Sequence, residues 1–307
     1  MPEKQITRNA IITAAGMSSR LVPLSFEKPK ALTCVRGEIL IERIIRQMQE
    51  ADIYEIVVVV GYFKEQFEYL VDKFGVILVE NPYYHLRNTN TSLYLVRDYL
   101  KNTIICHSDE YLTENIFLEP SETSYYSLTF MPGHAIDEWC VTMDASGRII
   151  DVNLEGEDCW VATDVAYLIE TDSAKMIPLL KETHEDDNAK NLYWEEIWMA
   201  HTDEIQMYGR TFENGVVQDL DTLSDFQEFD NNFMDNLNCT VLNKISADLG
   251  GTNDRLIDIQ NCTPIICDKE LTGMHFTVGD EAFKYNHIEQ TIDRQTSTEE
   301  LTLQKLY

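Results

Sequence analysis

Residues 56–62 read IVVVVGY, a run of five β-branched residues followed by glycine and tyrosine. A continuous run of this kind is typical of a central parallel strand that is covered on both faces. The next residues, 64–74 (KEQFEYLVDKF), have helical spacing, and residues 76–82 (VILVENP) are expected to form the next strand. The order strand, helix, strand predicts a βαβ crossover and therefore a parallel sheet.

The same alternation continues on both sides of this segment. Further strands are expected to end at residue 15 and to cover residues 103–112, and further helices are expected at residues 39–50 and 91–100. Asn90 or Thr91 is the expected N-cap of the last of these helices. We therefore predict an α/β fold, a Rossmann-like three-layer domain with a mixed, mainly parallel sheet and ligands at the carboxyl ends of its strands.

The second half of the chain changes character at residue 124. β-rich segments follow up to about residue 169, then helices near residues 171–182 and 191–201, two short strands, and a short helix near residues 222–230. We expect one domain over residues 1–230 and a C-terminal extension over residues 231–307. The polar residues 230–240 (DNNFMDNLNCT) are interpreted as a linker between them.

The amino-acid composition indicates which partners and which cellular location to expect. The chain has 307 residues, 44% of them hydrophobic, and no stretch approaches the roughly 18–20 apolar residues that span a bilayer. The formal net charge of −29 repels nucleic acid and anionic membranes, so neither is expected as a partner. The seven cysteines form no CxxC pair and the N-terminus does not resemble a signal peptide, so a reducing, cytoplasmic location is expected.

Charge is distributed unevenly along the chain. Residues 1–30 carry a net +3, whereas residues 151–230 hold 21 acidic and four basic residues, a net −17. One interpretation is a solvated acidic surface. The other is a bipolar site, with an anion at the N-terminal end and a cation or metal ion at the acidic half.

A strand end with two cations provides the first candidate site. Residues 14–32 read AAGMSSRLVPLSFEKPKAL. Small residues allow a ligand to approach the backbone, and loop amides can cradle phosphate oxygens. Arg20 can bind two oxygens with its guanidinium fork, and Lys30 supplies a compact charge. A plain structural turn is the alternative.

Ordered motifs along the chain give a resemblance to a known family. The segment AAGMSSRLVPLSFEKPKAL resembles the signature of nucleotidyltransferases that make sugar-nucleotides and related activated compounds. Further matching segments are EIVVVVGYFKEQFEYL, FGVILVENPYY, NTNTSLYLV, HSDEYL, DEWCVTMD, YWEEIW and DLDTLSDF. Over residues 8–230 the order and spacing are similar to the bacterial CTP:phosphocholine cytidylyltransferases. The resemblance implies Mg²⁺-dependent transfer of CMP from CTP to phosphocholine, with release of pyrophosphate.

Nucleotide-binding residues are expected in two segments. The first is the strand end and loop, with Ala14, Ala15, Gly16, Met17 and Ser18. The second is RNTNTSLYLV at residues 87–96, where sugar-nucleotide enzymes usually carry a Gly-rich turn. Asn88, Asn90 and Ser92 offer amide and hydroxyl groups suited to a base or ribose edge, and helix capping by Asn90 or Ser92 is the alternative.

Catalytic and metal-binding roles follow from strand ends and from the resemblance. Two acidic strand ends that face a phosphate site suit Mg²⁺. The resemblance places metal ligands at Asp109 and Asp221, with Asp219 as an alternative or a surface residue, and His107 as a neighbour. Lys30, Arg20 and Asp109 are then the expected catalytic residues.

The acceptor site is expected where aromatic residues stand beside carboxylates. Trp139 in DEWC and Tyr193, Glu195 and Glu196 in YWEEIW suit a quaternary ammonium group through cation–π contacts and charge, although packing is the alternative for each aromatic residue. Phosphoethanolamine, 2-aminoethylphosphonate or a sugar 1-phosphate remain alternative acceptors. A catalytically silent nucleotide-binding protein is the alternative of a different class.

The C-terminal extension faintly resembles the first strands of choline-kinase-like N-lobes, in residues 245–259 and 274–307. A kinase would need a catalytic loop further along, so the extension is interpreted as a remnant or as a lid-and-dimer appendage. The expected partners are thus CTP and a small phosphorylated amine, and a homodimer is left open.

Overall fold

The computed structural model describes residues 7–235, 237–251 and 259–295. Contacts divide the chain into two compact units, a large unit of Met1–Gly16 and Glu38–Leu220 and a small unit of Met17–Gly37 and Asp221–Tyr307. In this grouping residues 17–37 fall with the C-terminal residues, and the expected domain boundary at residue 230 stays a prediction. In the described residues no helix is long and apolar enough to cross a membrane.

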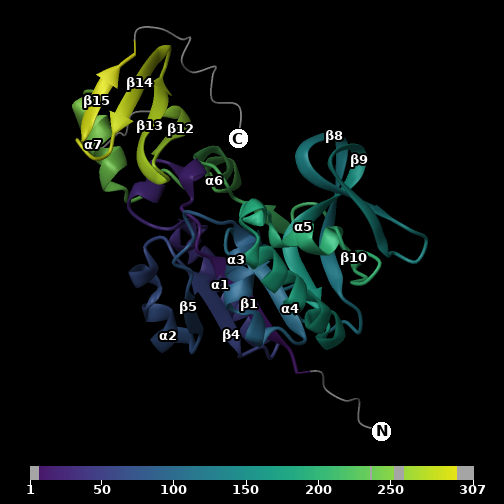
Figure 1. The fold of residues 1–307 in the computed structure, drawn as a ribbon. Helices are drawn as coiled ribbons and strands as arrows, with labels where there is room; N and C mark the ends of the chain where they lie inside the picture. Colours follow the sequence, from purple (N-terminus) through teal and green to yellow (C-terminus); the bar gives the residue numbers. More distant parts are fainter. Residues whose placement is uncertain (1–6, 236, 252–258, 296–307) are drawn as a thin grey trace. The chain divides into compact units, whose positions relative to one another are not determined.

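The large unit is built on a seven-stranded sheet (Figure 1). Its order is β10 (Tyr208–Phe212), β8 (Tyr125–Met143), β9 (Ile149–Leu168), β6 (Thr103–His107), β1 (Asn9–Ala14), β4 (Ile56–Val60) and β5 (Ile77–Glu80). β1 pairs in parallel with β4 and β6, and β4 with β5, whereas β9 runs antiparallel to β6 and β8. The predicted mixed, mainly parallel sheet is confirmed, and every residue of β1 and β4 is buried as expected for central strands.

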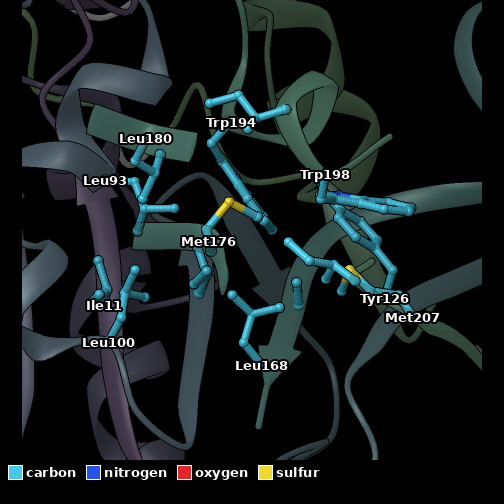
Figure 2. Packing of buried hydrophobic residues seen from close by; sticks show 14 of the residues in the cluster. Ile11, Leu93, Leu100, Tyr126, Leu168, Met176, Leu180, Trp194, Trp198 and Met207 are labelled. Atoms are coloured by element: carbon cyan, nitrogen blue, oxygen red, sulfur yellow. The ribbon is translucent and has the colours of Figure 1, made fainter. Parts of the chain in front are cut away.

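Helices pack on this sheet through their apolar sides. The α-helices of the large unit are α1 (Leu40–Glu50), α2 (Tyr69–Phe74), α3 (Thr89–Leu95), α4 (Glu170–Glu185) and α5 (Trp194–Met199). α3, α4 and α5 contribute to one core cluster with β1, β6, β8 and β9 (Figure 2). Within this cluster the ring centroid of Tyr126 lies 6.2 Å from that of Trp194 and 6.1 Å from that of Trp198. These two tryptophans are therefore packing residues of the core.

Two expected elements differ in the structure. The strand expected at residues 103–112 is split into β6 and β7 (Glu110–Leu112), because β7 leaves the main sheet and pairs antiparallel with β11 (Val217–Asp219). The N-cap of α3 is Asn88, whose side chain accepts a hydrogen bond from the Thr89 N–H, so the predicted caps Asn90 and Thr91 were wrong. Both of those residues lie inside the helix and are buried.

The small unit contains a four-stranded antiparallel sheet with helix α7 (Thr240–Asp248) (Figure 1). Its strands are β12 (Gln260–Cys267), β13 (Glu270–Val278), β14 (Glu281–Asn286) and β15 (Thr291–Arg294). The unit also holds α6 (Leu223–Phe229) and three short 3₁₀ turns at Ser19–Leu21, Leu24–Phe26 and Lys30–Leu32. Residues 252–258 and 296–307, which carry part of the kinase resemblance, lie outside the described residues, and that interpretation stays a prediction.

The predicted linker takes part in packing. Phe233 is 2% exposed, and its ring centroid lies 5.0 Å from that of Phe226 in α6. The described part of the segment is therefore anchored to the small unit. Two short strands complete the structure, β2 (Cys34–Val35) in the small unit and β3 (Glu38–Ile39) in the large unit. All seven cysteines fall within the described residues and have free thiols.

Candidate active site

The end of β1 leaves space beside the backbone. Ala14 and Ala15 are buried there, and Gly16 follows them at the surface. A Cβ atom on Gly16 would have no described heavy atom within 4 Å, and its φ is not positive. Neither packing nor backbone conformation requires this glycine, and its predicted role in letting a ligand approach the backbone stays a prediction. A Cβ on Gly61 would instead lie 2.8 Å from the Ala15 carbonyl oxygen.

The loop with the two predicted cations is closed by Ser18, within the small unit. Ser18 has φ 54°, in the left-handed region, and its hydroxyl accepts a hydrogen bond from the Lys30 backbone N–H at 3.0 Å. This contact joins the two ends of the loop. Lys30 is only 7% exposed, so its ammonium group is held within the protein.

Asp221 lies between the two predicted phosphate-binding cations. Lys30 Nζ donates a hydrogen bond to Asp221 Oδ1 at 2.5 Å, and the Arg20 guanidinium pairs with Asp221 Oδ2. The Lys30 and Asp221 side chains are 8% and 17% exposed, whereas that of Arg20 is 69% exposed. The Asp225 carboxylate accepts a hydrogen bond from the Asp221 backbone N–H at 3.0 Å, so two carboxylates lie beside the two cations.

Asp109 and Asp219 form an acidic edge in the large unit. Asp109 follows β6, and Asp219 ends β11, where its backbone pairs with Glu110. The two carboxylates offer oxygen atoms within 4.8 Å of one another. Oxygen ligands at this spacing fit Mg²⁺, which takes one or two carboxylates together with phosphate oxygens. Asp221 belongs to the small unit, so its predicted partnership with Asp109 stays a prediction.

Glu110 adds a buried carboxyl group next to this edge. It is 1% exposed, and its Oε2 has no hydrogen-bond partner among the described residues. Burial raises its pKa well above the ordinary value, and the nearby carboxylates of Asp219, Asp164 and Asp109 act in the same direction. The charge on His107 acts in the opposite direction and lowers the pKa of Glu110.

A second group of titratable side chains surrounds His107, the last residue of β6. His107 Nδ1 lies 2.9 Å from Asp164 Oδ2, and its Nε2 lies 3.6 Å from Glu195 Oε1. The Tyr126 hydroxyl donates a hydrogen bond to the same Glu195 oxygen at 3.1 Å. Burial lowers the pKa of His107, but Asp164 first, and then Glu195 and Asp109, raise it well above its ordinary value. Through its contacts with Asp164 and Glu195, His107 connects β6 with β9 and α5.

The same surroundings shift the pKa of Glu195. Burial raises its pKa to about 7, whereas the His107 charge acts in the opposite direction. Sequence reasoning identified His107 only as a neighbour of a metal ligand and did not identify Asp164 or Tyr126. The sequence signal for this group was the position of His107 at the end of a strand. In the structure β9 runs antiparallel to β6 with Val165 opposite Cys106, and this pairing places Asp164 beside His107.

The structure brings together the two aromatic residues of the predicted acceptor site. The rings of Trp139 and Tyr193 meet edge to face, with centroids 6.3 Å apart at 80°. Trp139 is partly buried and Tyr193 is 45% exposed, so at least one ring is open to solvent. The two residues come from β8 and from the start of α5, which are far apart in the sequence.

Both predicted acceptor carboxylates have structural partners. Glu195 is 3% exposed and contacts Tyr126 and His107 inside the protein. Glu196 accepts a hydrogen bond from the Tyr193 backbone N–H at 2.6 Å, which caps the start of α5. Recognition of a cation at Tyr193 would therefore depend mainly on the aromatic rings.

The predicted base-reading residues also make internal contacts. Asn88 caps α3 and donates to the Asn191 carbonyl oxygen at 3.0 Å. Asn90 is 1% exposed and donates to the carbonyl oxygens of Ala189 and Leu192. Ser92 accepts a hydrogen bond from Asn81 Nδ2 at 3.0 Å. These contacts explain the three residues structurally, and their nucleotide-binding roles stay predictions.

Comparison with known proteins defines the class. Residues 10–109 match the family model of the MobA-like NTP transferase domain. The 2-aminoethylphosphonate cytidylyltransferase of Lancefieldella rimae is 32% identical over 231 residues, which cover 74% of this chain and 93% of that protein. The choline-phosphate cytidylyltransferase of Streptococcus pneumoniae is 29% identical over 221 residues, which cover 72% and 96%.

Comparison with solved structures also matches the chain to a cytidylyltransferase. The structure of CTP:phosphocholine cytidylyltransferase from Streptococcus pneumoniae superimposes with a TM-score of 0.71 at 30% identity, and the match covers 74% of this chain and 99% of that one. The fold and the sequence matches thus define a nucleotidyltransferase. More specifically, the chain belongs to the CTP:phosphocholine cytidylyltransferase family, in the broad sense that includes the 2-aminoethylphosphonate enzyme.

Proposed function

We propose that this cytidylyltransferase uses Mg²⁺ and transfers CMP from CTP to phosphocholine, with release of pyrophosphate. The observation that carries the choice of acceptor is the edge-to-face contact between Trp139 and Tyr193. A quaternary ammonium group has no N–H to donate, so it is recognised through aromatic faces, with about 0.5–2 kcal/mol for each contact.

A primary ammonium group would make different demands. It carries three N–H donors, and each needs an acceptor when water is removed. Glu195 is buried against His107 and Tyr126, and Glu196 Oε2 accepts the Tyr193 backbone N–H, so of the two carboxylates only that of Glu196 lies beside Tyr193, with one oxygen already engaged. This arrangement favours phosphocholine over phosphoethanolamine.

The reaction requires alignment and charge neutralisation more than proton transfer. The phosphate of the acceptor is ionised near neutral pH, so no general base is needed for its attack on the α-phosphorus. Arg20 would hold the departing pyrophosphate, and Lys30 would neutralise charge at the α-phosphate or on the attacking phosphate. Asp109 and Asp221 would be the ligands of Mg²⁺, which would supply Lewis-acid charge to the phosphate oxygens.

His107 has a positioning role in this proposal. It contacts Glu195 of α5 and stands at the end of β6, two residues before Asp109. Through Glu195 it would hold the start of α5, where Tyr193 lies, at a fixed distance from the strand that leads to Asp109. A homodimer and a cytoplasmic location stay predictions.

A pyrophosphate-release assay tests the proposal. The protein should release pyrophosphate when CTP, phosphocholine and Mg²⁺ are all present, and mass spectrometry should identify CDP-choline. Replacement of CTP by UTP should reduce the rate. CTP binding without pyrophosphate release from any acceptor would support the alternative of a silent nucleotide-binding protein.

The second candidate acceptor is 2-aminoethylphosphonate. The L. rimae relative, which is 32% identical, is named for this substrate. The same assay distinguishes the two acceptors, because each gives a cytidine product of different mass. A higher kcat/KM with 2-aminoethylphosphonate than with phosphocholine would select the second candidate.

A further inference from the structure

The hairpin of β8 and β9 (Figure 1) carries two cysteines, Cys140 and Cys159, within the large unit. Cys140 pairs with Val161 of β9. Because side chains alternate between the two faces of a strand, Cys159 lies on the same face of β9 as Val161. Both cysteines belong to one small core cluster with Ala135, Val161 and Met131. The two thiols therefore lie on the same side of the hairpin.

The two sulfur atoms are in contact with each other. The Cys140 thiol donates a hydrogen bond to the Cys159 sulfur. A Cβ atom on Gly156 would lie 2.8 Å from Cys140 Sγ and 3.1 Å from Cys159 Sγ, so both sulfur atoms border the space beside this glycine. A larger residue at position 156 would collide with the thiol pair.

The two thiols differ in exposure. Cys140 is 5% exposed, whereas Cys159 is half-buried. Burial raises the pKa of Cys140 to about 12, and the hydrogen bond with Cys159 and the charges of Glu138 and Glu155 act in the same direction. Cys140 therefore keeps its proton, and Cys159 is the thiol of the pair that meets an oxidant from the solvent first.

The charge around the pair selects the kind of oxidant. The carboxylates of Glu138 and Glu155 act on the Cys140 thiol, and the whole chain carries a net charge of −29. This field repels anionic oxidants such as glutathione disulfide. Hydrogen peroxide is small and uncharged, so it can approach the half-buried thiol.

We propose that Cys140 and Cys159 form a reversible disulfide when hydrogen peroxide oxidises the protein, and that this disulfide weakens binding of the acceptor. The Cys159 thiolate attacks one oxygen of the peroxide, the O–O bond breaks, and hydroxide leaves, so that Cys159 becomes a sulfenic acid. The Cys140 sulfur then attacks the Cys159 sulfur, the S–S bond forms and water leaves. Two thiols are oxidised, and one peroxide is reduced to two molecules of water.

The contacts of the hairpin indicate which strand moves when the disulfide forms. Cys159 pairs with Met131, and the Asp158 side chain beside it accepts a hydrogen bond from the Gly133 N–H at 2.8 Å. The register of β8 against β9 shifts on both sides of Cys140. A disulfide bond of about 2 Å is shorter than a hydrogen-bonded contact between thiols, so we expect the irregular segment around Cys140 to move toward Cys159.

This movement would reach the proposed acceptor site. Trp139 precedes Cys140 in β8, and its ring meets that of Tyr193 edge to face. A shift of the Cys140 backbone should disturb this aromatic contact. The effect on the acceptor rests on the proposed function, in which Trp139 and Tyr193 recognise the ammonium group, whereas formation of the disulfide does not.

Mass spectrometry of the full chain after treatment with hydrogen peroxide tests for the disulfide. Remaining thiols are alkylated before digestion with trypsin. Arg148 is the only Lys or Arg between the two cysteines, so trypsin separates them and the disulfide should link peptides 102–148 and 149–175. The linked pair should be lighter than the two peptides together by two hydrogen atoms, and dithiothreitol should separate it.

Three variants identify the linked thiols. Peptide 102–148 also contains Cys106, so Cys140→Ser is needed to identify its linked thiol, and it should abolish the linked pair. Cys159→Ser, at a half-buried position, should abolish it as well. Cys262→Ser is the matched control, because Cys262 is also half-buried but lies in the small unit, and it should form the linked pair like wild type. Thermal unfolding of each variant establishes that it is folded.

Steady-state kinetics test the effect on the acceptor. The KM for phosphocholine should rise at least about threefold in peroxide-treated wild type, because part of the cation–π recognition is lost, and the KM for CTP should not change. Dithiothreitol should restore the KM. Peroxide-treated Cys159→Ser should keep its KM, which separates the disulfide from oxidation of other cysteines and of methionines.

Two results would overturn the inference, and both are distinct from failure of the proposed function. Absence of the linked pair from peroxide-treated wild type would overturn the disulfide, and a linked pair with an unchanged KM for phosphocholine would overturn its effect on the acceptor. If the linked pair forms but the reduced wild type makes no CDP-choline, the disulfide stands and the proposed function fails. If CDP-choline is made and no linked pair forms, the proposed function stands and the inference fails.

Discussion

Replacement of Lys30 by Met removes the buried charge beside Asp221 and keeps most of the apolar stem of the side chain. Lys30 Nζ lies 2.5 Å from Asp221 Oδ1, and both side chains are largely buried. Loss of one partner from a buried ion pair costs about 3–5 kcal/mol, because the other charge stays buried without compensation. Asp221 keeps Arg20, which is 69% exposed, so we expect about half of that loss, about 2 kcal/mol.

A double-mutant cycle with Asp221→Asn separates the pair from other contacts of Lys30. Urea unfolding of wild type, the two single variants and the double variant gives the coupling free energy. The double variant should recover most of the stability lost in Lys30→Met, since no unpaired carboxylate remains. It should not recover turnover, which we expect to fall at least about a hundredfold in Lys30→Met.

Two results would refute this reasoning. If Lys30→Met unfolds within about 0.5 kcal/mol of wild type, the ammonium group does not compensate Asp221 as the geometry indicates. If the double variant is as unstable as the sum of the single variants, the two side chains are energetically independent.

Three further predictions concern the metal ligand, the acceptor site and the buried histidine cluster. Asp109→Ala should lower turnover at least about a hundredfold at saturating Mg²⁺ with little loss of stability, and near-normal turnover would contradict its role as a ligand. Trp139→Ala should raise the KM for phosphocholine about five- to thirtyfold with little change for CTP, and Trp139→Phe but not Trp139→Leu should recover part of it. Burial in the folded protein raises the pKa of Glu195 from the ordinary value of 4.5 to about 7. Between pH 4.5 and pH 7 the folded protein therefore keeps a proton on Glu195 that the unfolded chain has lost. The free energy of unfolding should therefore fall as the pH rises from 4.5 to 7, by up to about 3 kcal/mol, and Glu195→Gln should flatten this dependence; parallel pH profiles would show that Glu195 does not titrate there.

Local patterns predicted the sheet because they depend on near neighbours. The run IVVVV forms β4, and the segment NAIITA before Ala15 and Gly16 forms β1, because mostly apolar segments of five or six residues are typical of central strands that are buried on both faces. Predicting Arg20, Lys30 and Asp221 as site residues needed no knowledge of the packing, because each follows a recognisable motif. Their mutual ion pairs were not predictable, since residue 221 is about 190 positions away from Lys30.

Long-range packing explains what the sequence did not indicate. Glu195 carries the same charge as Glu196 next to it, and only the position of α5 against Tyr126 and His107 turns it inward. Asn88 instead of Asn90 caps α3 because the helix begins one residue after Asn88, a boundary that propensity does not define to this precision. The contact of Glu27 with α7 joins segments more than 200 residues apart, so the extension was interpreted as an appendage.

The central claim is that aromatic rings at Trp139 and Tyr193 select a quaternary ammonium acceptor for cytidylyl transfer. The most direct measurement is kcat/KM of the wild-type enzyme for phosphocholine and for phosphoethanolamine, with CTP and Mg²⁺ saturating. These acceptors differ only in the methyl groups on nitrogen, so the ratio reports the head-group site alone. We predict at least a tenfold preference for phosphocholine, whereas equal values or a preference for the primary amine would contradict the account.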